Sequence, residues 1–90
     1  MDIKELISRY MAGQRDFRNL NLIAANLRNT NLSRANLSGA NLTKANLTRI
    51  NLSYANLTNA NLTGVNLTEA NLTNANLTDA ILTNANLTST

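Results

Sequence analysis

The stretch ANLTNANLTDAILTNANLT, residues 70–88, repeats a five-residue pattern whose one interruption is Ile81, at a position otherwise occupied by Asn. Each Asn-Leu-Thr in it also fits the N-glycosylation acceptor pattern. Glycosylation of this kind requires the secretory route, and the first residues, MDIKELISRYMAG, lack the uninterrupted apolar run of a secretory signal. We therefore expect the spacing to serve the fold, in a cytoplasmic protein without a membrane span.

The period of five extends from Arg15 to Ser89, which divides the chain into fifteen blocks. The centre of each block is Leu, or Phe17 in the first block, and a small or apolar residue, usually Ala, stands two positions earlier. Asn precedes the centre in every block except at Asp16 and Ile81. Ser or Thr follows the centre from Ser33 onward, so the fifth position alone varies freely.

Neither a helix nor a flat strand can use this period. Five residues rotate a helix by about 140°, which would distribute the leucines over all sides. In a strand, an odd period would turn alternate leucines to opposite faces. A short extended side followed by a corner satisfies the pattern, with Leu and Ala inside and Asn and Thr outside. Such sides, wound into stacked coils, predict a solenoid with outward Asn ladders and strand-like Ser/Thr hydroxyl ladders.

The first residues predict a short amphipathic helix. Asp2 is a suitable N-cap with Glu5 three residues later, as in a capping box, and Gly13 is a suitable C-terminal stop. We expect the helix to cover the open edge of the first coil. Its apolar stripe comprises Ile3, Leu6, Ile7, Tyr10 and Met11.

The blocks ANLSG, ANLTK and ANLTN resemble the pentapeptide-repeat family over residues 15–89. That resemblance implies an all-β solenoid, a right-handed quadrilateral β-helix with four blocks per coil, whereas the period alone does not distinguish four blocks from three. Fifteen blocks then make slightly under four coils. The leading ELISRYMAGQRDF resembles the N-terminal α-helical caps of cyanobacterial members. We therefore expect one structural domain, with a capping helix over residues 1–14 and the β-helix over residues 15–90.

Four blocks per coil make residues twenty apart vertical neighbours, which gives two tests of the register. Arg49 is then expected next to Glu69, as an exposed ion pair. Arg34 is expected next to Tyr54, as a cation–π contact.

The composition contains none of the usual catalytic constellations. There is no Cys and no His, and the sequence offers no paired carboxylates at a plausible site and no Gly-rich phosphate loop. We expect no enzyme activity, no cofactor and no metal, and instead a structural scaffold or protein-interaction module with an unknown protein partner.

Charge suggests the competing class of function, a nucleic-acid-related role. Residues 15–50 carry six basic residues against Asp16, a net charge of +5, while residues 51–90 carry −2. Basic residues can attract nucleic acid, but here they are spread over different sides without an aromatic stacking platform. Some family members bind DNA gyrase by resembling DNA, with acidic residues at the outward position that is Asn here. We therefore favour protein binding, with gyrase mimicry or weak electrostatic nucleic-acid binding as the alternative.

Two surfaces follow from the pattern. The chemically distinctive outward residues, expected to contact a partner, are Arg34, Lys44, Arg49, Tyr54, Glu69 and Asp79. The C-terminal coil is expected to form a homodimer, in preference to fraying in water, through Leu77, Ile81, Leu82 and Leu87. A shortened chain, or one idealised by design, would show the same near-perfect repetition.

Overall fold

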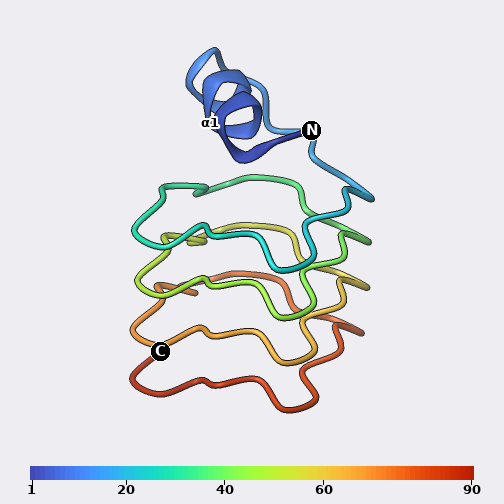
Figure 1. The fold of residues 1–90 in the computed structure, drawn as a ribbon, viewed down its shortest axis with the longest axis vertical. Helices are drawn as coiled ribbons and strands as arrows, with labels where there is room; N and C mark the ends of the chain where they lie inside the picture. The colour runs from blue at the N-terminus through green and yellow to red at the C-terminus, as the bar shows by residue number, and fades with distance from the viewer.

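The computed structural model describes residues 1–90, and it consists of one helix followed by a stack of coils (Figure 1). The helix α1 (Ile3–Met11) begins after Asp2, whose Oδ1 accepts a hydrogen bond of 2.8 Å from the Glu5 backbone N–H. The predicted N-cap is therefore confirmed, but the capping box is half formed, because the Glu5 carboxylate pairs with Arg9 one turn later. Gly13 follows the helix with a φ of 104°, which suits glycine.

Parallel backbone bridges join residues twenty apart, from Asp16 with Asn36 to Asn66 with Asn86. Four five-residue blocks therefore complete one coil. An inner coil bonds to both neighbours: the Leu42 N–H donates to the Asn61 carbonyl of the next coil at 2.8 Å, and the Asn41 N–H donates to the Leu20 carbonyl of the preceding coil at 2.9 Å. In Figure 1 the coils lie one below another, with α1 at the N-terminal end of the stack.

A β-turn occupies the second half of each block. In one block the Ala45 N–H donates to the Leu42 carbonyl at 2.9 Å, and Lys44 has a φ of 59°. Other side-chain-bearing residues at this fifth position have φ values from 55° at Asn74 to 64° at Arg34. The positive sign is the one that a type II turn requires at its third residue. The prediction of strand-like backbone at Ser and Thr is therefore wrong, since these residues lie in turns and the bridges are isolated.

The Asn residues stack in register as predicted, but their side chains bond within their own block. Asn46 Oδ1 accepts from the Thr48 backbone N–H at 3.1 Å and from Thr48 Oγ1 at 2.7 Å. This Asx turn gives the Thr48 backbone N–H a hydrogen-bond acceptor from its own block. The predicted hydroxyl ladders are wrong for the same reason, since most of the Thr hydroxyls donate to the Asn Oδ1 of their own block. One hydroxyl pair joins successive coils, Ser38 with Thr58 at 2.9 Å.

Leu and small apolar residues fill the interior of the stack, as predicted. The buried set includes Leu6 of α1, Phe17 and the central leucines of the blocks from Leu22 through Leu67, with no buried polar or charged residue. Each fully buried Leu stabilises the folded state by roughly 1.5–3 kcal/mol relative to an exposed one. The last coil is less covered: Leu72, Leu77 and Leu82 are partly buried and pack against this core.

Candidate interaction surfaces

The six predicted partner-surface residues all occupy the fifth position of a block, and all six are exposed. Each has a positive φ, so its backbone forms the corner of a turn. The register places them on four different sides: Arg34 and Tyr54 share one, and Arg49 and Glu69 share another. Lys44 and Asp79 each lie on one of the two remaining sides. The structure therefore brings together two pairs and no larger cluster of these residues.

Both predicted contacts between coils are confirmed. The Arg34 guanidinium carbon lies 4.6 Å from the centroid of the Tyr54 ring. Arg49 Nη1 lies 4.0 Å from Glu69 Oε1, and Arg49 Nε also donates to Asn29 Oδ1 at 2.8 Å. Because these side chains are exposed, each contact contributes at most about 1 kcal/mol. Both contacts agree with the twenty-residue register that the backbone bridges set.

The basic residues near the N-terminus form local pairs. Asp16 replaces the usual Asn and plays the same part, since its Oδ1 accepts from the Arg18 backbone N–H at 3.2 Å. The Arg18 side chain also bonds both carboxylate oxygens at 2.9 Å. This side-chain hydrogen bonding lowers the pKa of Asp16 below its ordinary value and raises the pKa of Arg18. Arg15 stacks over the Tyr10 ring at 3.7 Å.

The six basic residues of residues 15–50 are distributed around the stack and make no single patch. Arg18, Lys44 and Arg34 lie on three different sides, and Arg28 shares the fourth with Arg49. This distribution differs from the clustered basic patch or stripe that is typical of a nucleic-acid interface.

The four predicted dimer-contact residues lie in the last coil. Leu77 and Leu82 are partly buried, whereas Ile81 and Leu87 are 49% and 43% exposed. Ile81 forms a backbone bridge with Asn61 but cannot supply the side-chain oxygen that Asn gives to its turn. The backbone N–H groups of Leu72, Leu77, Leu82 and Leu87 have no hydrogen-bond partner in the chain, unlike their counterparts in earlier coils. This end is apolar and has open backbone donors.

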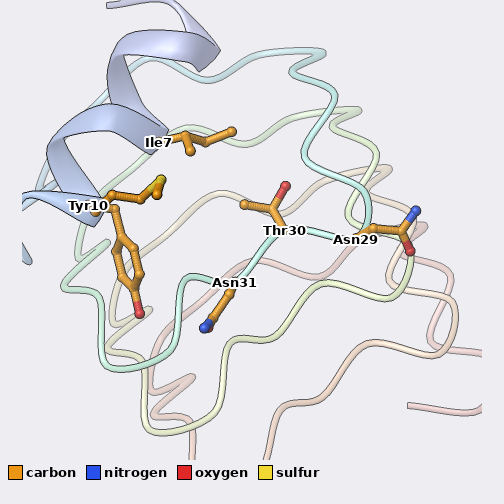
Figure 2. Close-up of a pocket in the computed structure, with 6 residues that line it drawn as sticks. Ile7, Tyr10, Asn29, Thr30 and Asn31 are labelled. Atoms are coloured by element: carbon orange, nitrogen blue, oxygen red, sulfur yellow. The ribbon is translucent and has the colours of Figure 1, made fainter.

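A groove between α1 and the first coil was not predicted. It encloses about 360 Å³, and Figure 2 shows Ile7 and Tyr10 on its helix side, opposite Asn29, Thr30 and Asn31. Met11 completes the lining and is 81% exposed, so the predicted apolar stripe of α1 is only partly packed. The helical period identifies the stripe, but it carries no information on how much of the coil a helix of this length covers.

No group of His, Cys, Asp and Glu in the structure is arranged to bind a metal ion. The helix α1 does not have the length or apolar character needed to cross a membrane.

A family model for pentapeptide repeats, eight copies long, matches residues 16–53 and 50–88. The chain belongs to the pentapeptide-repeat family. Members of this family form right-handed quadrilateral β-helices, and they are generally non-enzymatic repeat scaffolds. Both the family and the class of solenoid were predicted from the repeated blocks.

Three solved structures of cyanobacterial pentapeptide-repeat proteins are similar to this chain. The protein alr5209 from Nostoc PCC 7120 is 40% identical over 88% of this chain and 74% of its own, with a TM-score of 0.42. HetL from Nostoc sp. strain PCC 7120, which is involved in heterocyst differentiation regulation, is 33% identical over 98% and 48%, with a TM-score of 0.47. Rfr23 from Cyanothece 51142 is 36% identical over 79% and 58%, with a TM-score of 0.30.

The chain thus spans about half the length of HetL and somewhat more of Rfr23. A search of the curated proteins gave no match.

Proposed function

We propose that this pentapeptide-repeat protein is a non-catalytic scaffold that binds a protein partner through the outer sides of its coils. The working unit is a rod of slightly under four coils, capped at its first coil by α1. One observation carries the proposal: the chemically distinctive residues all stand exposed at turn corners, on a framework whose coils are joined by backbone hydrogen bonds.

The framework leaves the corner residue free to vary. Backbone bonds join the coils, and the Asn side chain bonds the turn within its block, so neither depends on the fifth side chain. Several blocks carry Asn at this corner, including Asn59 and Asn74, with φ values of 59° and 55°. Exchanging the corner residue for another that accepts positive φ therefore changes the surface chemistry and leaves the rod intact.

The test replaces all six corner residues, Arg34, Lys44, Arg49, Tyr54, Glu69 and Asp79, by Asn. Proteins captured by the wild type from a lysate of the source cells are compared with those captured by this variant, with circular dichroism as the check of folding. A matched control changes Asn59 and Asn74 to Gly, which accepts the same positive φ.

We expect the control to retain a partner that the six-residue variant loses. Retention of the same proteins by the six-residue variant would contradict the proposal. Recovery of nucleic acid with the wild type, falling steeply with added salt, would support the electrostatic alternative instead.

We propose in addition that the chain of residues 1–90 self-associates through its last coil. Support comes from the exposed Ile81 and Leu87 and from the open backbone donors of Leu77 and Leu82. Exposed apolar groups beside unpaired backbone groups favour pairing with a second edge.

Light scattering across a concentration series tests this association with the wild type, Ile81→Lys and Leu87→Lys. We expect a dimer that becomes a monomer on either substitution. A wild-type monomer at every concentration would refute it. Lys4→Ala, at the opposite end of the stack, is the control that should leave the mass unchanged.

A further inference from the structure

The first coil has an open backbone position beside α1. In the second coil, the Asn51 N–H donates to the Thr30 carbonyl at 2.9 Å, and the Asn51 carbonyl accepts from the Leu32 N–H at 2.8 Å. The equivalent first-coil residue is Asn31, whose backbone N–H and carbonyl have no partner in the chain. These two groups together form one vacant bridge.

The helix supplies part of what a preceding coil would supply on this side. In the second coil, the Ser53 carbonyl accepts from the Arg34 N–H at 2.9 Å. At the matching place in the first coil, the Ser33 carbonyl accepts from the Tyr10 hydroxyl at 2.8 Å. The hydroxyl thus satisfies the carbonyl that lies two residues beyond the vacancy, and the bridge at Asn31 stays open.

The vacancy lies in the wall of the groove described above, opposite an apolar surface. Figure 2 shows Asn31 and Thr30 on one side and Ile7 and Tyr10 of α1 on the other. A volume of about 360 Å³ lies within the range of ligand pockets. Met11, 81% exposed, adds a flexible apolar side chain to the helix wall.

Two cationic residues, Lys4 and Arg28, flank the groove-lining residues in the sequence. Lys4 lies three residues before Ile7 and seven before Met11, so it shares their face of α1. Arg28 directly precedes the lining residue Asn29. Neither cation has a salt-bridge partner, and no carboxylate lines the groove. The charge therefore favours an acidic occupant.

We propose that this groove binds an extended, acidic peptide segment of a partner protein by β-augmentation. One peptide residue pairs with Asn31: the carbonyl before it accepts from the Asn31 N–H, and the N–H after it donates to the Asn31 carbonyl. An apolar side chain contacts Ile7 and Met11, while acidic side chains approach Lys4 and Arg28. Asn21 and Asn26 of the first coil also lack backbone partners, but of these three residues only Asn31 lines the groove, which favours a single strand over a second copy's whole coil.

The site is separate from the outer corners, so either proposal can fail without the other. The test is a titration of the isotope-labelled full chain, followed by NMR. The probe is an alternating Glu-Val peptide of about eight residues, roughly 26 Å when extended. Comparison peptides are the Lys-Val counterpart and a Glu-Val peptide whose backbone nitrogens are methylated at alternate residues, which removes the bridge donors.

We expect the Glu-Val peptide to shift the Asn31 amide and the Ile7 and Met11 methyl signals, and to bind about tenfold more tightly than either comparison peptide. Met11→Glu should weaken binding about tenfold, since it removes apolar contact and adds a repelling charge. Ile23→Glu is the matched control, because Ile23 is 52% exposed and does not line the groove.

Three results would overturn the proposal. They are equal binding of the Lys-Val peptide, no shift at Asn31 at millimolar peptide, and equal loss of binding in Ile23→Glu and Met11→Glu. A shift at Asn31 that depends on protein concentration without peptide would assign the groove to a second copy instead.

Discussion

At the scale of single residues, the repeated Asn has a role that its position in the pattern did not reveal. The sequence predicted its outward place, which the stacked bridges confirm. It did not predict that Oδ1 would bond the turn of its own block, because the period gives the direction of a side chain and not its hydrogen-bond partner. The exceptions show the difference: Asp16 keeps that acceptor and Ile81 lacks it.

We predict that Asn46→Ala lowers the free energy of unfolding by about 1–3 kcal/mol, because two hydrogen bonds to Thr48 are lost. Asn46→Asp keeps the acceptor oxygen and is the control, with a loss less than half as large. Urea denaturation measures both. An Ala variant as stable as the wild type would show that water replaces the side chain without cost.

The corner residue is constrained by conformation and not by chemistry. We predict that Lys44→Val destabilises the fold by about 1–3 kcal/mol, because a β-branched residue is strained at a φ of 59°. Lys44→Asn should be nearly neutral, since Asn accepts positive φ. The midpoints of urea denaturation measure the difference between the two variants. Equal midpoints for Lys44→Val and Lys44→Asn would contradict the predicted strain.

Asp16 makes the first block sensitive to acid. Its pKa is lower in the folded chain, because of Arg18, than the ordinary value of 3.8. Ionised Asp16 therefore stabilises the fold above pH 3.8, and this contribution is lost as the pH falls through the lowered folded value. We predict that the difference in urea midpoint between the wild type and Asp16→Asn is constant near neutral pH and changes in acid. A difference independent of pH down to 2 would contradict it.

At the scale of the helix, sequence reasoning located α1 and its N-cap, while the depth of each side chain depended on the coil below. Leu6 is fully buried and Met11 is exposed, although both belong to the same predicted stripe. The burial of each residue in a helical stripe depends on the surface against which it packs, and residues elsewhere in the chain form that surface. The groove was missed for this reason.

We predict that Leu6→Ala lowers the free energy of unfolding by about 2–5 kcal/mol, because it leaves a cavity between α1 and the core. The hydrogen-exchange rates of the Leu22 and Leu27 amides should increase more than the rate of the Leu57 amide. Met11→Ala, on the same helix but exposed, should change neither quantity. Uniform acceleration along the chain would show that α1 does not protect the first coil selectively.

At the scale of the whole molecule, the repeated blocks were sufficient to predict the class of solenoid, but the period left three or four blocks per coil open. Contacts between different residue types resolve that question, since Arg49 meets Glu69 and Arg34 meets Tyr54 at a spacing of twenty. Identical blocks cannot report their register, because any shift by a whole block matches Asn with Asn. The few dissimilar corner residues carry that information.

The stack also has a gradient of burial that leads to a last prediction. Leu42 and Leu62 are buried, whereas Leu82 is partly buried and Leu87 is exposed. Each coil contacts mainly its neighbours, so opening is expected to begin at the less buried end. Asn71, Asn76 and Asn86 donate to the preceding coil at 2.9 Å, as Asn51 and Asn56 do in the middle.

We therefore predict that the amides of Asn71, Asn76 and Asn86 exchange faster than those of Asn51 and Asn56, although their hydrogen bonds are equal in length. Hydrogen exchange followed by NMR measures this at dilute and at high protein concentration. If the last coil self-associates, its exchange slows as concentration rises, while that of Asn51 stays the same. Equal protection along the dilute stack would mean that it unfolds as one cooperative unit, and the gradient in burial would then have no counterpart in local stability.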